Sequence, residues 1–279
     1  MDVRFHGSCD EFRAIAEPLY RRDPVANTIE LTVLCAPTLP EDSLLLTVWD
    51  GSKLAGAAIQ TPPYPLACNA ITVVTVDLVA SEVLRVRPEL SGVRGVSGTA
   101  FAFAEAWRAL TGRVGRVSVE ERLYRLGTLR PPVGAAGSAR TAGADDRAVL
   151  VDWIEEFFVE TFGHDRDEQA GARFVEAATA KGDRFVLWTV DGEPVSMAML
   201  RAPAADVSRI GPVFTPAERR ARGYGSAVTA AAAELAHRTG TADVVLFADL
   251  ANPVSNAIYQ RIGFEAVADS VRIDFGSPD

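Results

Sequence analysis

Apolar and polar positions alternate in two ways along this chain, and each pattern recurs in both halves. Helical spacing of apolar residues predicts helices over residues 10–20, 99–110, 147–162, 168–180 and 226–239. Pro18 is expected to end or kink the first of these helices. Period-two patterns predict strands over residues 117–129, 207–214 and 243–249. Residues 27–34 and 70–89 fit both a helical and an extended pattern.

Two predicted hairpins resemble each other. LLTVWDGSKLAGAAIQTP, at residues 45–62, is similar to VLWTVDGEPVSMAMLRAP, at residues 186–203, and each has an Asp-Gly turn between two apolar runs. Each half also holds a helix that ends in Thr-Gly. A Pro- and Gly-rich connector is predicted over residues 129–143. We therefore expect an internal repeat and two domains, residues 1–135 and 136–279.

Composition narrows the functional class. Apolar residues make up 48% and charged residues 23%, as in a typical globular protein. No apolar run approaches the length of a membrane span, and the first residues lack a secretory signal. Three cysteines without a C-x-x-C pair argue against a disulfide framework or a zinc site. The net charge of −9 argues against nucleic-acid binding. A cytoplasmic protein without a bound metal, a membrane partner or a nucleic-acid partner is expected.

Residues 213–226, VFTPAERRARGYGS, carry the clearest chemical signal. They lie between a predicted strand and a long predicted helix. Gly223 and Gly225 allow a close backbone approach, and a helix N-terminus directs N–H groups at an anion. Arg219, Arg220 and Arg222 add positive charge. The pattern favours a phosphate-binding loop over its alternative, a surface turn with a solvated basic patch.

A second candidate site follows the predicted strand 243–249. Asn252 suits a helix N-cap, Pro253 the first helical position and Gly263 the helix end. Asn252, Asn256 and Tyr259 would share one helix face. Taken alone, Tyr259 fits a packed core aromatic and Asn252 a simple cap. The upstream loop favours a functional role for both.

Residues 138–279 resemble the GNAT superfamily of acyl-CoA-dependent N-acyltransferases. The resemblance rests on the order strand, R-x-x-G-x-G, helix, strand and N-P-x-x-N, although Tyr259 follows the second asparagine by only three positions. It implies an α/β (α+β) fold with two GNAT-like domains, each a mixed, mostly antiparallel sheet flanked by helices. It also implies that Tyr259 is the general acid. The implied acetyl-CoA contacts are Val213, Phe214, Thr215, Arg219, Arg220, Ala221, Arg222, Gly223, Tyr224, Gly225, Ser226, Asn252 and Asn256.

The implied reaction is transfer of an acetyl group from acetyl-CoA to a primary amine of a small molecule or protein by direct attack. A backbone N–H at the end of strand 207–214 would polarise the thioester carbonyl. The general base is not evident. The candidates are Glu156, Glu160 and Asp249, and a water chain could serve in their place. Glu156 and Glu160 also fit a solvated helix face that has no catalytic role. A homodimer is compatible with this reading. The competing function is a non-catalytic acyl-CoA-binding or sensing module, against which the presence of Tyr259 argues.

The first half resembles the same fold more faintly. Its expected counterpart of the phosphate loop is Gly92–Gly98, in which Gly92 replaces Arg220 and Ser97 replaces the second glycine. The basic flank is also thinner. We therefore expect residues 1–135 to be a degenerate GNAT-like domain that has lost its coenzyme site and that forms a wall of the acceptor cleft.

Overall fold

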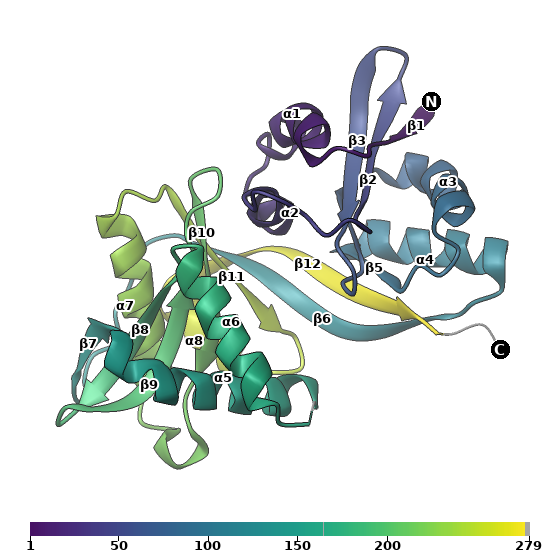
Figure 1. Cartoon of the computed structure of the whole chain (residues 1–279). Helices are drawn as coiled ribbons and strands as arrows, with labels where there is room; N and C mark the ends of the chain where they lie inside the picture. Colours follow the sequence, from purple (N-terminus) through teal and green to yellow (C-terminus); the bar gives the residue numbers. More distant parts are fainter. Residues whose placement is uncertain (164, 277–279) are drawn as a thin grey trace. The chain divides into compact units, whose positions relative to one another are not determined.

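The computed structural model describes residues 1–163 and 165–276, which form eight α-helices, three short 3₁₀ helices and twelve strands (Figure 1). Contacts between residues divide the chain into two compact units. Unit 1 contains residues 1–123, 248–252 and the chain from residue 267 onward. Unit 2 contains residues 124–247 and 253–266. The units are therefore not two consecutive segments that meet near residue 135.

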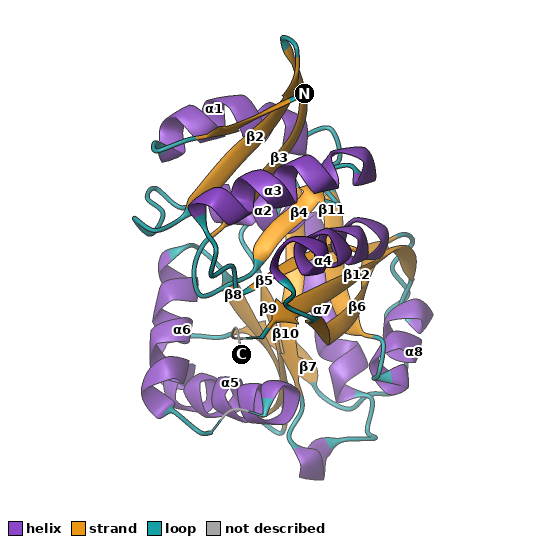
Figure 2. Cartoon of the chain, turned by 90° about the vertical axis from the view of Figure 1, so that its right-hand side faces the viewer, coloured by secondary structure: helices purple, strands orange, loops and turns teal. Residues whose placement is uncertain are grey.

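Unit 1 is a mixed sheet between two helix pairs. Helices α1 and α2 cover one face, while α3 and α4 pack together on the other (Figures 1 and 2). The strand order is β1-β2-β3-β4-β5-β12, and only the β4–β5 pair is parallel. The elements are β1 (Asp2–Phe5), α1 (Cys9–Tyr20), α2 (Thr28–Leu34), β2 (Leu44–Asp50), β3 (Lys53–Gln60), β4 (Leu66–Ala70), α3 (Val76–Val86), β5 (Gly92–Val96), α4 (Ser97–Thr111), β6 (Gly115–Leu126) and, from the chain's end, β12 (Phe264–Phe275).

Unit 2 repeats this plan. Its strand order is β7-β8-β9-β10-β11, and again only the last pair is parallel. Helices α5 and α6 pack against each other, and α7 packs on β8, β9 and β10. The elements are β7 (Ser138–Thr141), α5 (Arg147–Phe162), α6 (Glu168–Ala180), β8 (Arg184–Val190), β9 (Glu193–Leu200), β10 (Val207–Phe214), α7 (Tyr224–Arg238), β11 (Asp243–Asp249) and α8 (Pro253–Arg261).

The two halves exchange parts of their last strands. Residues 124–126 of β6, the last strand of the first half, belong to unit 2. Conversely, residues 270–274 of β12, the last strand of the second half, pair antiparallel with β5 in unit 1. Each unit therefore takes one strand segment from the other half of the sequence.

The expected fold class is confirmed, with mixed, mostly antiparallel strands and flanking helices. Both hairpins and the predicted helices and strands are present, and α1 runs two residues beyond Pro18. Of the undecided stretches, residues 27–34 contain α2, and residues 70–89 contain the last residue of β4, a 3₁₀ helix at Val73–Thr75 and α3. Within the predicted connector, residues 129–143, strand β7 forms by pairing with β8. The sequence patterns did not reveal β12.

The proposed counterpart of the phosphate loop in the first half was also wrong. Gly92–Val96 forms strand β5, and Ser97 begins α4. Because β4 corresponds to β10 and α3 to α7, the equivalent connection is residues 71–75. This segment reads ITVVT and contains neither glycine nor arginine.

The core of unit 2 fixes the end of β10, where the predicted phosphate loop begins. Apolar side chains of α5 and α6 pack on one face of β8, β9 and β10. Phe214, the last residue of β10, is buried there, and its ring lies 6.3 Å from that of Trp153. None of the described helices has both the length and the apolar composition needed to cross a membrane.

Candidate functional site

A β-bulge shapes the end of β10. Ile210 pairs with Leu200 of β9, but the next recorded pair is Val213 with Ala198, so β10 contains one extra residue. Gly211 lies in the bulge with φ of +146°, a conformation that favours glycine. A bulge bends its strand and redirects the residues that follow. Val213 and Phe214 are the residues redirected here.

Ser196 of β9 holds the chain as it leaves β10. Its Oγ donates to the carbonyl oxygen of Phe214 over 2.9 Å and lies 2.8 Å from Oγ1 of Thr215. A hydroxyl has a single hydrogen, so the Thr215 hydroxyl is the donor in the second bond. Ser196 is fully buried. The carbonyl of Phe214 and the hydroxyl of Thr215 are therefore both engaged within the protein.

The loop then enters α7, whose first N–H groups are not capped by any described side chain. Gly223 is the N-cap with φ of +81°, and no side chain in the described part of the chain caps this helix. The first backbone bond of the helix runs from the N–H of Ala227 to the carbonyl of Gly223. The N–H groups of Tyr224, Gly225 and Ser226 therefore point out of the helix start, which is the arrangement that binds phosphate.

The two glycines keep this helix start accessible. A Cβ on Gly225 would lie 3.4 Å from Oγ1 of Thr215, so the loop passes close to the end of β10. The Tyr224 side chain is buried, which leaves its backbone as the part available to a ligand. These residues fit a coenzyme pyrophosphate, because no side chain in the described part of the chain accepts a hydrogen bond from the start of α7.

The three arginines of the loop differ in their surroundings. Arg219 and Arg222 are exposed and form no ion pair with any carboxylate that the structure describes. Arg220 is held within the protein, with Nε 2.8 Å from the carbonyl of Thr215 and Nη2 2.6 Å from a carboxylate oxygen of Glu160. Its guanidinium also lies 5.8 Å from the Phe214 ring centre. Arg220 therefore ties the loop to α5 and β10.

Tyr259, the predicted acid, is buried on α8. Only 9% of the residue is exposed, and burial raises the pKa of its phenol to about 12, against the opposing effect of a hydrogen bond with Ser255. Its ring centre lies 6.5 Å from that of Tyr124 and 6.2 Å from that of Phe264. At neutral pH the phenol is protonated, as a general acid must be.

The two predicted asparagines have different environments. Asn256 is half-buried, and its Oδ1 accepts a hydrogen bond of 2.8 Å from the hydroxyl of Tyr124. Asn252 is exposed and precedes α8, in the short segment that groups with unit 1. Contact of either side chain with acetyl-CoA stays a prediction.

The three candidate bases differ in their surroundings. Glu160 is engaged by Arg220, and a carboxylate oxygen of Asp249 accepts the N–H of Ala251 over 2.7 Å. The pKa of Glu156 is raised because its carboxyl is partly removed from water and Asp152 lies nearby. In the described residues, His, Cys, Asp and Glu side chains form no group that could hold a metal ion.

Sequence reasoning missed three residues that shape this site. Ser196 had a detectable signal, because a polar residue interrupts an otherwise apolar strand of a hairpin. Tyr124 had none, since a tyrosine in an alternating strand is ordinary. Gln260 had none either, because polar residues are common on helix surfaces.

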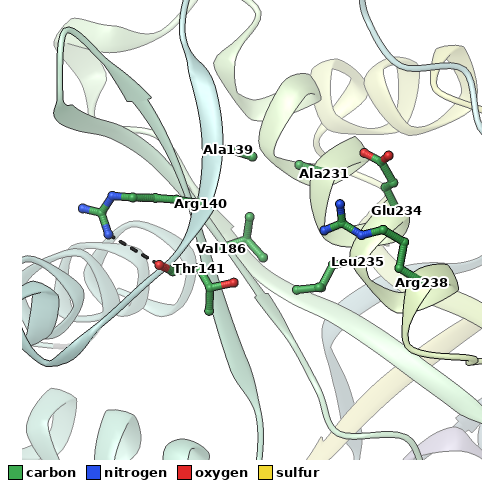
Figure 3. Close-up of a pocket in the computed structure, with 8 residues that line it drawn as sticks. All are labelled: Ala139, Arg140, Thr141, Val186, Ala231, Glu234, Leu235 and Arg238. Carbon is green, nitrogen blue, oxygen red and sulfur yellow. Dashed lines mark hydrogen bonds between the residues drawn. The ribbon is translucent and has the colours of Figure 1, made fainter.

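A cavity of about 180 Å³ lies elsewhere in unit 2. It is bounded by β7, β8 and the C-terminal half of α7, as Figure 3 shows, whereas the phosphate loop is at the N-terminus of this helix. Arg140 turns away from it and binds Asp146 with two hydrogen bonds of 2.6 Å and 2.7 Å. The lining residues are Ala139, Arg140, Thr141, Val186, Ala231, Glu234, Leu235 and Arg238. The cavity contains none of the predicted site residues.

Part of unit 2 matches a known protein family, and the fold of the whole chain is similar to that of solved structures. The model of the acetyltransferase (GNAT) family matches residues 148–264. A GCN5-related N-acetyltransferase from Sphaerobacter thermophilus superposes with a TM-score of 0.65 at 16% identity, covering 100% of this chain and 97% of that one. A GNAT-family acetyltransferase from Colwellia psychrerythraea gives 0.64 at 10% identity, covering 99% and 100%.

A third solved structure is a tandem GNAT protein from the clavulanic acid biosynthesis pathway. It covers 100% of both chains, with a TM-score of 0.62 and 16% identity. At such identities the likeness establishes the fold and no more. No curated protein sequence matches this chain.

Proposed function

Because this chain carries a domain of the acetyltransferase (GNAT) family over residues 148–264, we propose that it is an N-acetyltransferase that uses acetyl-CoA. Acyl transfer as the reaction type follows from the family. The observation that carries the finer proposal is the uncapped, glycine-bearing start of α7 in the same unit as the buried, protonated Tyr259.

In this proposal the backbone N–H groups of Tyr224, Gly225 and Ser226 hold the pyrophosphate of acetyl-CoA. Arg219 and Arg222 add electrostatic attraction at the exposed rim of the loop. Arg220 contributes indirectly, by holding the loop in place, because Glu160 and Thr215 already bind its guanidinium. The backbone of Val213 and Phe214, redirected by the bulge, would lie along the pantetheine.

Tyr259 would act as the general acid. Acetyl-CoA supplies a thioester whose carbonyl carbon forms a C–N bond with a neutral primary amine as the C–S bond breaks. Tyr259 then holds the proton that the departing thiolate needs. The phenol is protonated at the pH of the cell, as this role requires, and its pKa of about 12 makes it a weaker acid than an ordinary tyrosine.

Glu156 is the carboxylate that we favour as general base. It must take the proton that the amine loses on forming the amide. A raised pKa makes this carboxylate a stronger base than an ordinary glutamate. Glu160 is paired with Arg220, and Asp249 supports a turn, so neither is equally available.

Unit 1 is proposed to lack a coenzyme site. The connection equivalent to the phosphate loop, residues 71–75, has no glycine to bring its backbone close to a phosphate and no arginine. Its Val73 and Val74 are exposed, with 57% and 83% of each residue accessible. Exposed valines offer a phosphate no favourable contact, so one coenzyme per chain is expected.

A non-catalytic acyl-CoA-binding module is the second candidate. The burial of Tyr259 is the observation in its favour, because a sensing module would keep the loop and use the tyrosine only for packing.

A turnover assay distinguishes an N-acetyltransferase from a non-catalytic acyl-CoA-binding module. The purified full-length chain would be given acetyl-CoA with a panel of primary amines and a lysine-containing peptide, and released thiol would be measured. Amine-dependent thiol release supports the enzyme. Acetyl-CoA binding by calorimetry without amine-dependent release supports the binding module.

A further inference from the structure

Tyr124 connects the first half of the chain to the helix that carries Tyr259. It is fully buried near the end of β6, within the part of that strand that belongs to unit 2. Its hydroxyl donates to Oδ1 of Asn256 over 2.8 Å and accepts from Nε2 of Gln260 over 3.2 Å. Asn256 and Gln260 are one helical turn apart on α8, so a single phenol holds two successive turns.

The residues after Tyr124 hold the end of the same helix. The N–H of Gly127 donates to the carbonyl of Gly263 over 3.0 Å, and the N–H of Arg130 donates to the carbonyl of Ile262 over 2.9 Å. A Cβ on Gly263 would lie 2.0 Å from the carbonyl oxygen of Thr128, so these backbones are in direct contact. We call residues 124–130 the α8 brace.

We propose that Tyr124 is a positioning residue that orients α8 and therefore Tyr259, so that the site in unit 2 is incomplete without the last strand of the first half. This inference rests on the proposed role of Tyr259 as the acid. It gives the first half a part in the reaction through a buried side chain that acts by holding α8.

The orienting role of the Tyr124 hydroxyl can be tested separately from the packing of the Tyr124 ring. The ring of Tyr124 packs beside that of Tyr259, at 6.5 Å between centres. A phenylalanine keeps this ring contact and removes only the hydroxyl. Asn256 and Gln260 then lose their bonds to this hydroxyl, so α8 loses its side-chain link to β6 while its apolar contacts and the backbone bonds at its end remain.

The chain offers a matched control. Tyr20 of α1 is also fully buried, but in unit 1, and its hydroxyl has no hydrogen-bond partner among the described residues. Tyr20→Phe is therefore the same chemical change in a comparable environment without the loss of a bond. Gln260→Leu is a second test variant, because Gln260 is exposed and its replacement removes one bond without altering the core.

The experiment measures kcat and KM for acetyl-CoA with an accepted amine, using the full chain. Tyr124→Phe is expected to lower kcat about tenfold or more and to change KM less than about twofold, since a misplaced acid weakens the transition state alone. Gln260→Leu should lower kcat by a smaller factor, and Tyr20→Phe should leave both constants unchanged.

Hydrogen exchange at the amides of α8 provides a readout that needs no turnover. Faster exchange there in Tyr124→Phe, but not in Tyr20→Phe, is the expected result. Equal exchange in all three proteins, or an unchanged kcat in both Tyr124→Phe and Gln260→Leu, would overturn the inference. If the wild-type chain itself shows no amine-dependent turnover, the proposed function fails, and exchange at α8 still decides whether Tyr124 positions the helix.

Discussion

Nη2 of Arg220 lies 2.6 Å and 2.8 Å from the two carboxylate oxygens of Glu160. The pair joins the phosphate loop to helix α5 across 60 positions of sequence. It assigns Arg220 to holding the loop in place, and it places Glu160 beside the loop instead of leaving it available as a base.

Glu160→Gln should weaken acetyl-CoA binding about twofold to fivefold and leave kcat within about twofold. The reason is that an ion pair between half-exposed groups contributes about 1 kcal/mol or less, and here it orders the loop. Calorimetry and steady-state kinetics measure the two effects. Glu176→Gln is the matched control, because it removes an exposed ion pair with Arg147 away from the loop.

Two other outcomes would reassign these residues. A loss of kcat by about a hundredfold or more would identify Glu160 as the general base. Tighter binding of acetyl-CoA would show that Arg220 is itself a phosphate ligand that Glu160 restrains.

Gly223→Val should weaken acetyl-CoA binding about tenfold or more. Gly223 has φ of +81°, a conformation that a β-branched residue strongly disfavours, so the loop must change its path. Gly240→Val is the control, because Gly240 has φ of +85° at the other end of α7. Both variants should lose about 2 kcal/mol of stability in urea unfolding, but only the first should lose affinity. Equal affinities in the two variants would place the coenzyme elsewhere.

Calorimetric titration of the wild-type chain should give about one acetyl-CoA per chain. Unit 1 has the sequence ITVVT where unit 2 has its glycine-bearing loop, so it lacks the glycines that let a backbone approach a phosphate and the arginines that add charge. A stoichiometry of two, which Gly223→Val reduces to one, would show that unit 1 also binds the coenzyme.

Tyr259 should titrate far above an ordinary tyrosine. Its pKa is raised from 10.0 to about 12 by burial, so the phenol should remain neutral where exposed tyrosines ionise. The stabilisation from this burial is therefore complete below about pH 10 and is lost as the pH rises through about 12. The difference in ultraviolet phenolate absorbance between wild type and Tyr259→Phe measures this directly. A difference signal that appears near pH 10 would contradict the buried position.

The sequence predicted most local structure because the patterns that specify it are local. The strand 207–214, the Asp-Gly hairpins and the Asn-Pro helix start each depend on residues within one element, and the structure confirms them. The loop at Arg219–Ser226 could be recognised because a strand and a helix enclose its glycines.

The partners of these elements could not be predicted in this way. The alternation of apolar and polar residues over 117–129 indicates a strand but does not say which sheet the strand joins. The sequence therefore could not predict that Tyr124 belongs to unit 2. Tyr124 and Asn256 are 132 positions apart, and only the fold brings them together. The first-half loop was misplaced at Gly92–Gly98 for the same reason, since its glycines resembled the motif while its topological position was unknown.

Tyr259→Phe tests most directly whether unit 2 transfers an acetyl group with Tyr259 as the acid. The phenylalanine preserves the ring contacts with Tyr124 and Phe264 and removes only the hydroxyl. Amine-dependent thiol release from acetyl-CoA should fall about a hundredfold in kcat, while calorimetric affinity for acetyl-CoA stays within about threefold. An unchanged kcat across the pH range, with an amine that the wild type accepts, would contradict this role of Tyr259.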